Sequence, residues 1–193
     1  FNSRRKSGER VRLRADGGIF MDDDQLDALE ELGAHIAAQL GTDLLARHIA
    51  NGELTIEIGI DALRRVLKLL RDDANCLFKG LMDVCGVDYP EQENRFEVVY
   101  NLLSYKHNQR IRVKVRTNAD TPVPSVARIF PTAAWFEREC WDMYGVFFSD
   151  HDDLRRLLTD YGFEGHPLRK DFPLRSAERR VGNECSSRWS PYP

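Results

Sequence analysis

Three ionisable side chains lie close together in the sequence and could do acid–base chemistry: Glu137, Asp142 and His151. Two carboxyl groups and an imidazole can serve as the general acid, general base and orienting group of a hydrolase. Glu137 and Asp142 are five residues apart, however, and this spacing does not place both on one helix face. The segment also lacks a His-Glu-x-x-His or Cys-x-x-Cys pattern and a nucleophile on a glycine turn. A stand-alone hydrolase is therefore a remote alternative to a helix whose charges serve a partner or solvent.

A helix over residues 132–145 is the element that must position these groups. Its apolar side chains recur at helical spacing and form one stripe, while the acidic side chains lie off it. The stripe consists of Phe136, Cys140, Met143 and Tyr144. Pro131-Thr132 suits the start of this helix and Gly145 its end.

The preceding chain has clear helix and strand patterns. Apolar residues predict a helix over 22–40, with three aspartates at its N-terminus and Gly41 at its end. Alternation predicts a strand over 54–60, and Asp61 is expected to cap a second helix with Leu63, Val66, Leu67 and Leu70 on its buried face. Further strands are predicted at 77–88, taken as a central strand, at 96–102 and at 110–116, with a hairpin turn at 106–109.

The last of these strands has one basic face. Its apolar residues alternate with Arg110, Arg112, Lys114 and Arg116. A nucleic-acid platform would interleave stacking aromatic residues with the charges, and this strand has none. We expect a solvated sheet face, or one that meets an acidic partner, and no nucleic-acid binding.

These elements predict an α+β fold over residues 21–148, with a mixed or antiparallel sheet and helices over one face. Residues 149–174 are expected to form an extended, irregular C-terminal arm. Leu154, Leu157 and Leu158 could form one or two helical turns within it, before glycines and prolines break regular structure. The arm could lie on a partner protein or pack back on its own domain.

Both ends of the sequence stand apart. Residues 1–20 begin with Phe1 and carry a basic run, which we interpret as sequence upstream of a true start at Met21; a transit-peptide remnant and a solvated tail are the alternatives. Residues 175–193 have no periodicity and resemble a translated sequencing adapter, so we expect a non-native tail. We therefore expect no functional role for Cys185 and Trp189.

Composition narrows the function classes. The chain has 193 residues, 42% hydrophobic and 31% charged, with a net charge of −3. This is a soluble composition with no general attraction to nucleic acid, and no apolar run has the length of a membrane span. The four cysteines match no zinc or iron–sulfur spacing, and no glycine-rich dinucleotide fingerprint follows a strand. We expect no metal site, and buried reduced thiols at Cys76, Cys85 and Cys140.

The helix and the start of the arm resemble a known signature. Glu137-Arg138-Glu139, Asp142, Met143-Tyr144, His151, Arg155 and Leu157-Leu158 match the pattern of the C subunit of respiratory complex I, the proton-pumping NADH:quinone oxidoreductase. Residues 159–174 and 86–90 are also similar to this family. The resemblance covers residues 21–174.

The resemblance implies a scaffold subunit with no catalytic centre and no cofactor of its own. It implies a place in the peripheral arm of the complex, among the other peripheral-arm subunits and beside the D subunit, which helps to shape the quinone site and which we call the quinone-site subunit. The complex uses FMN, iron–sulfur clusters, NADH and quinone, and it couples electron transfer to proton translocation. The chain would then meet the inner membrane of a cell or mitochondrion only through the complex, on the cytoplasmic or matrix side. The equivalent protein of a membrane-bound hydrogenase or of a chloroplast-type complex is the alternative.

The residues expected to matter are interface and scaffold positions of the helix and arm. Glu137, Arg138, Glu139 and Asp142 should make partly buried ion pairs, with Arg155 and Arg156 as bidentate partners for carboxylates. His151, His166 and Asp171 should fix the arm by hydrogen bonds. The other expected positions are Gly145, Leu154, Tyr161, Gly162, Phe163, Gly165, Pro167, Arg169 and Lys170.

Overall fold

The computed structural model describes residues 23–173, so the N-terminal extension (1–20) and the adapter-like tail (175–193) lie outside the described part. The helices are α1 (Asp23–Leu40), α2 (Leu63–Asp72) and α3 (Ala133–Tyr144), with short 3-10 turns η1 (Gly41–Asp43) and η2 (Ile60–Ala62). The strands are β1 (Leu44–Ala50), β2 (Glu53–Ile58), β3 (Gly80–Asp88), β4 (Phe96–Ser104), β5 (Gln109–Thr117), β6 (Val123–Pro124) and β7 (Phe148–Ser149). None of the helices in this part of the chain has both the length and the apolar character needed to cross a bilayer.

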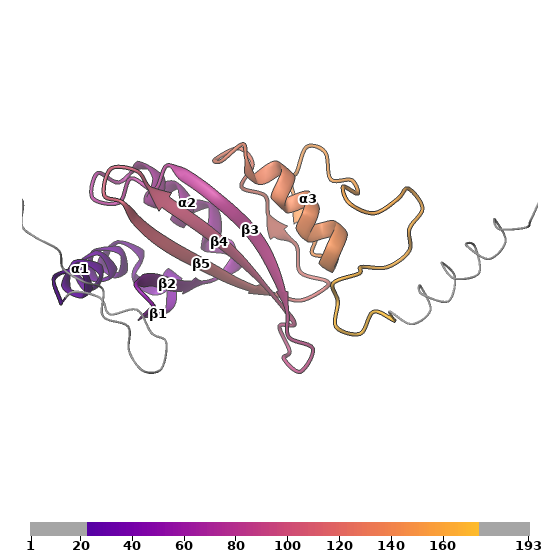
Figure 1. The fold of residues 1–193 in the computed structure, drawn as a ribbon, viewed down its shortest axis with the longest axis horizontal. Coiled ribbons are helices and arrows are strands. Elements are labelled where there is room, and N and C mark those ends of the chain that lie inside the picture. The colour runs from indigo at the N-terminus through magenta and orange to yellow at the C-terminus, as the bar shows by residue number, and fades with distance from the viewer. Residues whose placement is uncertain (1–22, 174–193) are drawn as a thin grey trace, which may run out of the picture.

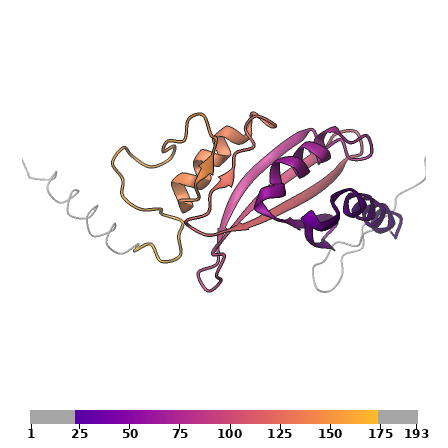
Figure 2. The ribbon, with the colours of Figure 1, turned by 180° about the vertical axis from the view of Figure 1, so that it is seen from behind.

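The main sheet has five strands in the order β1-β2-β5-β4-β3. Strands β2 and β5 are parallel, and the other neighbours are antiparallel. A separate parallel pair joins β6 to β7. The predicted α+β fold with a mixed sheet is therefore confirmed. Figure 1 shows α1 at one end of the molecule and α3 with the arm at the other, and Figure 2 shows α2 lying across the sheet.

One face of the sheet forms the core together with the helices. The inward residues of its strands, such as Ile56, Tyr100 and Val113, are fully buried and belong to one cluster with the apolar residues of α1, α2 and α3. The four residues predicted for the buried face of α2 are all at 0% exposure: Leu63, Val66, Leu67 and Leu70. Burial of this continuous apolar surface is what holds three otherwise separate helices on the sheet.

The opposite face of the sheet carries the basic residues of β5, and their acidic partners come from the same chain. Arg112 Nη2 lies 2.7 Å from a carboxylate oxygen of Glu53 on β2, and Lys114 Nζ lies 2.9 Å from Glu97 on β4. Arg116 is 3.6 Å from the second oxygen of Glu97. The sheet face that appeared purely basic in the sequence of one strand is a mixed-charge surface, because cross-strand neighbours supply the opposite sign.

Strand β1 was missed by the sequence patterns. Most of its residues are exposed, so it lacks the alternation that marks a half-buried strand. A signal was present nonetheless. The hairpin between β1 and β2 turns at Asn51 and Gly52, which both have positive φ angles (53° and 81°), as a type I′ turn requires.

Strand β3 was wrongly taken as central. It begins at Gly80 rather than at residue 77, and it lies at the edge of the sheet next to β4 alone. Its apolar composition has another cause, because α3 packs closely against it. A Cβ on Gly86 would come within 2.7 Å of the Tyr144 ring, and the Cys140 thiol lies 3.4 Å from the Val84 carbonyl oxygen.

Two local predictions were also wrong. Asp61 does not cap α2, because it lies inside η2, and Ala62 occupies the cap position without a side-chain hydrogen bond. Leu154, Leu157 and Leu158 form no helical turn, since residues 150–173 contain neither helix nor strand. The physical reason is that the N–H groups at residues 157–159 bond to a side chain of α3 instead of to preceding carbonyls.

Candidate functional site

Helix α3 is the platform of the candidate site. It ends where the sequence predicts, because Gly145 adopts the left-handed conformation (φ 78°) and its N–H donates to the Trp141 carbonyl oxygen. The expected division into a buried apolar stripe and an outer charged face is wrong. Glu137 and Asp142 are both at 0% exposure, and Arg138 is at 7%. The arm covers a second side of the helix and bonds to Arg138 and Asp142. Glu137 is buried against the segment of Ser125 and Val126 instead.

Asp142 holds the arm through five hydrogen bonds. Its Oδ2 accepts from the backbone N–H groups of Leu157, Leu158 and Thr159 at 2.7–3.0 Å. Its Oδ1 accepts from Arg156 Nη1 at 2.8 Å and from the Thr159 hydroxyl at 2.5 Å. We call Asp142 and these four partners the first anchor. Every donor comes from one short stretch of the arm, so one carboxylate fixes that stretch on α3.

The first anchor keeps Asp142 ionised despite its burial. Burial alone would raise the pKa of Asp142, but the hydrogen bonds from Thr159, Leu158 and Leu157 outweigh it and hold the pKa well below the ordinary range. A carboxylate with a strongly lowered pKa and saturated lone pairs makes a poor general base. The arrangement suits a structural charge.

Arginines of both elements strengthen this contact. Arg156 lies 5.8 Å from the centre of the Trp141 ring and 5.7 Å from that of Phe163, so it bridges helix and arm by cation–π contacts. In the reverse direction, Arg138 on α3 donates to the carbonyl oxygens of Arg155 and Arg156, each at 3.2 Å. Within residues 23–173 the Arg155 guanidinium is exposed and donates to the exposed Asp153 at 2.9 Å, so a buried carboxylate partner for Arg155 on another subunit stays a prediction.

A second anchor ties the end of the arm to the hairpin between β3 and β4. Arg95 donates to both oxygens of Asp88 at 2.6 and 2.8 Å, and to both oxygens of Asp171 at 2.8 and 3.0 Å. The Lys170 N–H adds a bond of 2.8 Å to Asp88. The hydrogen bond from Arg95 lowers the pKa of Asp88, and it lowers that of Asp171 to about 2. We define the second anchor as Asp88, Arg95, Lys170 and Asp171.

Between the anchors, the arm covers the C-terminal end of α3. The last carbonyl groups of a helix have no partner within the helix. Here His166 Nδ1 lies 2.9 Å from the Asp142 carbonyl oxygen, the Leu168 N–H donates to Met143, and Arg169 Nε donates to Tyr144. A cationic side chain at this end also complements the helix dipole. Burial lowers the pKa of His166, which favours its neutral form.

Glu137 belongs to a separate buried cluster. Its two oxygens accept from the Ser125 hydroxyl at 2.6 Å and from the Val126 N–H at 2.7 Å, and burial raises its pKa. His151 Nε2 lies 3.9 Å from Glu137 and donates to the Ala134 carbonyl oxygen at 3.0 Å, while Nδ1 accepts from a backbone N–H. The Glu137 and His151 side chains are at 0% and 3% exposure.

This arrangement does not support the hydrolase alternative. Glu137 and His151 are enclosed and bonded to the protein, and Asp142 is occupied by the first anchor. Two cavities of about 300 Å³ in the described part of the chain are lined by residues of other elements. The three groups therefore do not converge on a space for substrate.

The remaining predicted positions lie along the described part of the arm or at the surface of α3. Leu154 packs on the core, and Phe163 stacks on Phe172 with ring centres 6.0 Å apart. Gly162 and Gly165 have positive φ angles. Tyr161 is 90% exposed, while Glu139 is exposed and Pro167 half-buried.

Sequence reasoning missed several partners. Arg95, Ser125 and Thr159 supply central bonds of the three clusters. Arg95 and Ser125 stand in segments without a distinctive pattern, whereas Thr159 begins the segment 159–174 that resembles the family. A signal existed for Asp88, since residues 86–90 carry part of the family resemblance. A further set, His35, Asp73 and Cys76, brings potential metal ligands within 4.8 Å of one another, although His35 stands 38 positions before Asp73 in the sequence. Burial, with the nearby Asp73 carboxylate, raises the pKa of the Cys76 thiol to about 12.

Comparison with known proteins gives consistent results. A family model described as the respiratory-chain NADH dehydrogenase 30 Kd subunit matches residues 56–178. A protein of Paramagnetospirillum magneticum, named as the C subunit of NADH-quinone oxidoreductase, is 62% identical over 148 residues, which are 76% of this chain and 74% of the relative. The protein of the same name from Rhodospirillum rubrum is 59% identical over 152 residues, 79% of this chain and 71% of the relative.

A solved structure shares the fold. One chain of the membrane-bound sulfane sulfur reductase, an archaeal respiratory membrane complex, superposes with a TM-score of 0.69. The match covers 80% of this chain and 91% of that chain at 24% identity. At this identity the likeness concerns the fold alone.

Proposed function

The chain belongs to the family of the 30 kDa subunit of respiratory-chain NADH dehydrogenase, and on that premise we propose that it is a cofactor-free scaffold subunit of the peripheral arm of NADH-quinone oxidoreductase. Its role is to dock beside the quinone-site subunit. In this way it supports electron transfer from NADH to quinone, coupled to proton translocation, without a catalytic centre of its own. FMN and the iron–sulfur clusters belong to other subunits, and the chain meets the membrane only through the complex, on the cytoplasmic or matrix side.

The scaffold role is supported by the hydrogen bonds that Asp142, a signature residue, makes to the arm. Asp142 and Glu137 are the two fully buried acids of the signature. Both carboxylate oxygens of Asp142 accept their hydrogen bonds from the arm. The chemistry of an active site would leave such a group facing a substrate. Here the Asp142 carboxylate and the Arg156 guanidinium fix the conformation of the irregular arm. A segment that is already fixed in its bound conformation loses less entropy when it docks on a partner.

The outer surface of the arm and α3 offers the means of docking. Large apolar side chains are exposed there, although the segment is firmly anchored underneath: Trp135 (61%), Leu158 (63%), Tyr161 (90%) and Leu168 (50%). Exposed aromatic and aliphatic anchors on a rigid frame are typical of protein interfaces. We propose that this surface, which we call the arm surface, meets the quinone-site subunit.

Two alternatives from related systems remain distinguishable. The two relatives named for NADH-quinone oxidoreductase are 62% and 59% identical, whereas the chain from the sulfane sulfur reductase is 24% identical. The identities of 62% and 59% to proteins of the NADH-quinone enzyme favour that enzyme over a membrane-bound hydrogenase or a chloroplast-type complex.

Co-purification of the full chain with the quinone-site subunit of the same source tests the proposal. We expect both proteins to elute together in size exclusion, with no iron or flavin in the fraction of this chain alone. Tyr161→Ser should weaken the complex at least tenfold, since exposed tyrosines are frequent interface hot spots. The matched control is Tyr105→Ser, because Tyr105 is 70% exposed at the turn between β4 and β5, away from the arm. Elution of the chain as a monomer in the presence of the quinone-site subunit would contradict the proposed docking. An equal loss of affinity in Tyr161→Ser and Tyr105→Ser would contradict the assignment of the arm surface.

A further inference from the structure

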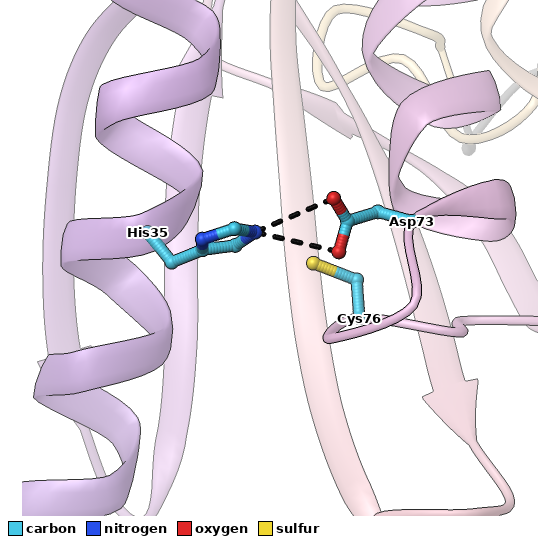
Figure 3. A group of neighbouring side chains, drawn as sticks. All are labelled: His35, Asp73 and Cys76. Carbon is cyan, nitrogen blue, oxygen red and sulfur yellow. Dashed lines mark hydrogen bonds and ion pairs between the residues drawn. The ribbon is translucent and has the colours of Figure 1, made fainter.

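Three side chains from two distant parts of the sequence point toward one another where α1 meets the loop after α2. Figure 3 shows His35 on α1 facing Asp73 and Cys76, which lie in the loop after α2. His35 Nε2 is 3.3 and 3.4 Å from the two oxygens of Asp73, and the three ligand atoms of the cluster lie within 4.8 Å of one another. Cys76 is buried, and the other two side chains are half-buried.

The loop presents its two groups in a fixed geometry. The Asp73 carbonyl oxygen accepts from the N–H groups of Cys76 and Leu77, and the Asp73 carboxylate accepts from the Asn75 N–H at 2.8 Å. Phe78 N–H closes the loop onto the Leu70 carbonyl oxygen at 2.9 Å. Asp73 and Cys76 are three residues apart in this tight turn, a spacing that metal-binding turns commonly use.

We propose that His35, Asp73 and Cys76 form a binding site for a divalent cation of the zinc class. Zinc takes thiolate, imidazole and carboxylate ligands at about 2.0–2.3 Å. Tetrahedral ligands at those bond lengths stand about 3.3–3.8 Å apart. The 3.3 Å between His35 and Asp73 already fits, and the Cys76 sulfur, within 4.8 Å of both, would have to move inward by up to roughly 1 Å. One thiolate and one carboxylate also balance the charge of a divalent ion.

The surroundings leave room for a fourth ligand. A cavity of about 300 Å³ adjoins the cluster and is lined by His35 and Asn75, together with His107 and Glu31. Water can therefore reach the ion and complete a tetrahedral site. On binding, the thiol gives up its proton to solvent as the metal–sulfur bond forms, and no oxidant or reductant is needed.

The site would join two elements that pack separately on the sheet. Helix α1 contributes His35, and the loop that follows α2 contributes the other two ligands. Because binding to the folded chain alone stabilises it by mass action, the ion should raise the unfolding temperature and protect α1 from hydrogen exchange.

Cobalt(II) binding to the full chain, purified without a histidine tag and with Cys185→Ser in every sample, tests this proposal. We expect about one equivalent of bound Co²⁺, the number one site requires, with a thiolate-to-cobalt charge-transfer band that Zn²⁺ abolishes by displacement. Cys76→Ser should lose the band, while Cys85→Ser should keep it. His35→Gln should lower the affinity for Co²⁺ at least tenfold, while His107→Gln, in the same cavity, should not.

The cobalt spectra of the parent chain and of Cys76→Ser decide whether the site exists. No charge-transfer band in the parent chain, or a band that survives Cys76→Ser, would overturn the site. If circular dichroism shows that Cys76→Ser does not fold, His35→Gln decides instead, because His35 keeps 28% of its side chain exposed and tolerates replacement. Unchanged affinity in that variant would equally overturn the proposal. The test uses no partner protein, so its failure would leave the docking proposal standing.

Discussion

Replacing Asp142 with asparagine tests how the arm is held on α3. Asparagine keeps the size of the side chain and one carbonyl oxygen, which can still accept from the backbone N–H groups of residues 157–159. Its NH2 group, however, faces the Arg156 guanidinium and the Thr159 hydroxyl, where the carboxylate accepted two hydrogen bonds. The guanidinium then lies against another donor instead of an anion.

The size of the effect follows from the burial of this pair. Breaking a buried ion pair by changing one partner costs about 3–5 kcal/mol. Arg156 retains 19% exposure and keeps its bonds to Thr159 and to the Gly165 carbonyl oxygen, so solvent softens the loss. We therefore expect a cost of about 3 kcal/mol, at the lower end of that range. This corresponds to an increase of roughly 100-fold in the population of the detached arm.

Hydrogen exchange of the amides of Leu157, Leu158 and Thr159 measures this population. Their protection should fall by roughly 100-fold in Asp142→Asn. Asp153→Asn is the matched control, since Asp153 is in the same arm but 58% exposed and paired with an exposed arginine. Its effect should stay within about threefold, as for most surface ion pairs. Unchanged protection in Asp142→Asn, or equal loss in the control, would refute the role given to the first anchor.

Three further predictions concern the second anchor, the end of α3 and pH. Arg95→Ala should lower the free energy of unfolding in urea by about 3 kcal/mol, because it leaves the buried Asp88 carboxylate without its cation; Arg128→Ala, which removes an ion pair about 80% exposed, should change it by less than about 0.5 kcal/mol. Gly145→Ala should lower the thermal unfolding temperature more than Gly162→Ala, because both residues have positive φ but only at Gly145 would a Cβ collide with Arg169 and His166. The lowered pKa values in both anchors stabilise the folded chain above the unfolded pKa of about 4, and this stability is lost as pH falls further, so the urea midpoint should drop between about pH 5 and pH 2, less steeply in Asp142→Asn. An unchanged free energy of unfolding in Arg95→Ala would contradict the role of the second anchor. Equal losses of unfolding temperature in the two glycine variants would contradict the steric role of Gly145, and a urea midpoint that does not change between about pH 5 and pH 2 would contradict the role of the two ionised anchors.

The features of the fold that a few neighbouring residues determine could be predicted from the sequence. The buried face of α2 follows from helical periodicity, and the end of α3 follows from the single glycine that can adopt a positive φ there. The turn between β4 and β5 likewise lies where polar residues interrupt two alternating runs, with Asn108 at φ 51°. Each of these features is encoded within a few residues.

Features that depend on distant partners could not be predicted in this way. The burial of Asp142 arises because the arm returns over α3, and the donors stand 14–17 residues further along the chain. The acidic partners of the basic face on β5 become visible only once the strand order is known. The cluster of His35 and Asp73 joins residues 38 positions apart. In each case tertiary packing, rather than a local pattern, supplies the partner.

The most direct test of the central claim separates assembly from turnover. The quantity to measure is the amount of assembled NADH-quinone oxidoreductase in membranes carrying Asp142→Asn, together with NADH:quinone activity per assembled enzyme. If Asp142 has a scaffold role, Asp142→Asn lowers the amount of assembled enzyme, while the NADH:quinone activity per assembled complex stays near that of the parent. Full assembly with lost turnover would contradict the scaffold role and would assign Asp142 to the chemistry itself.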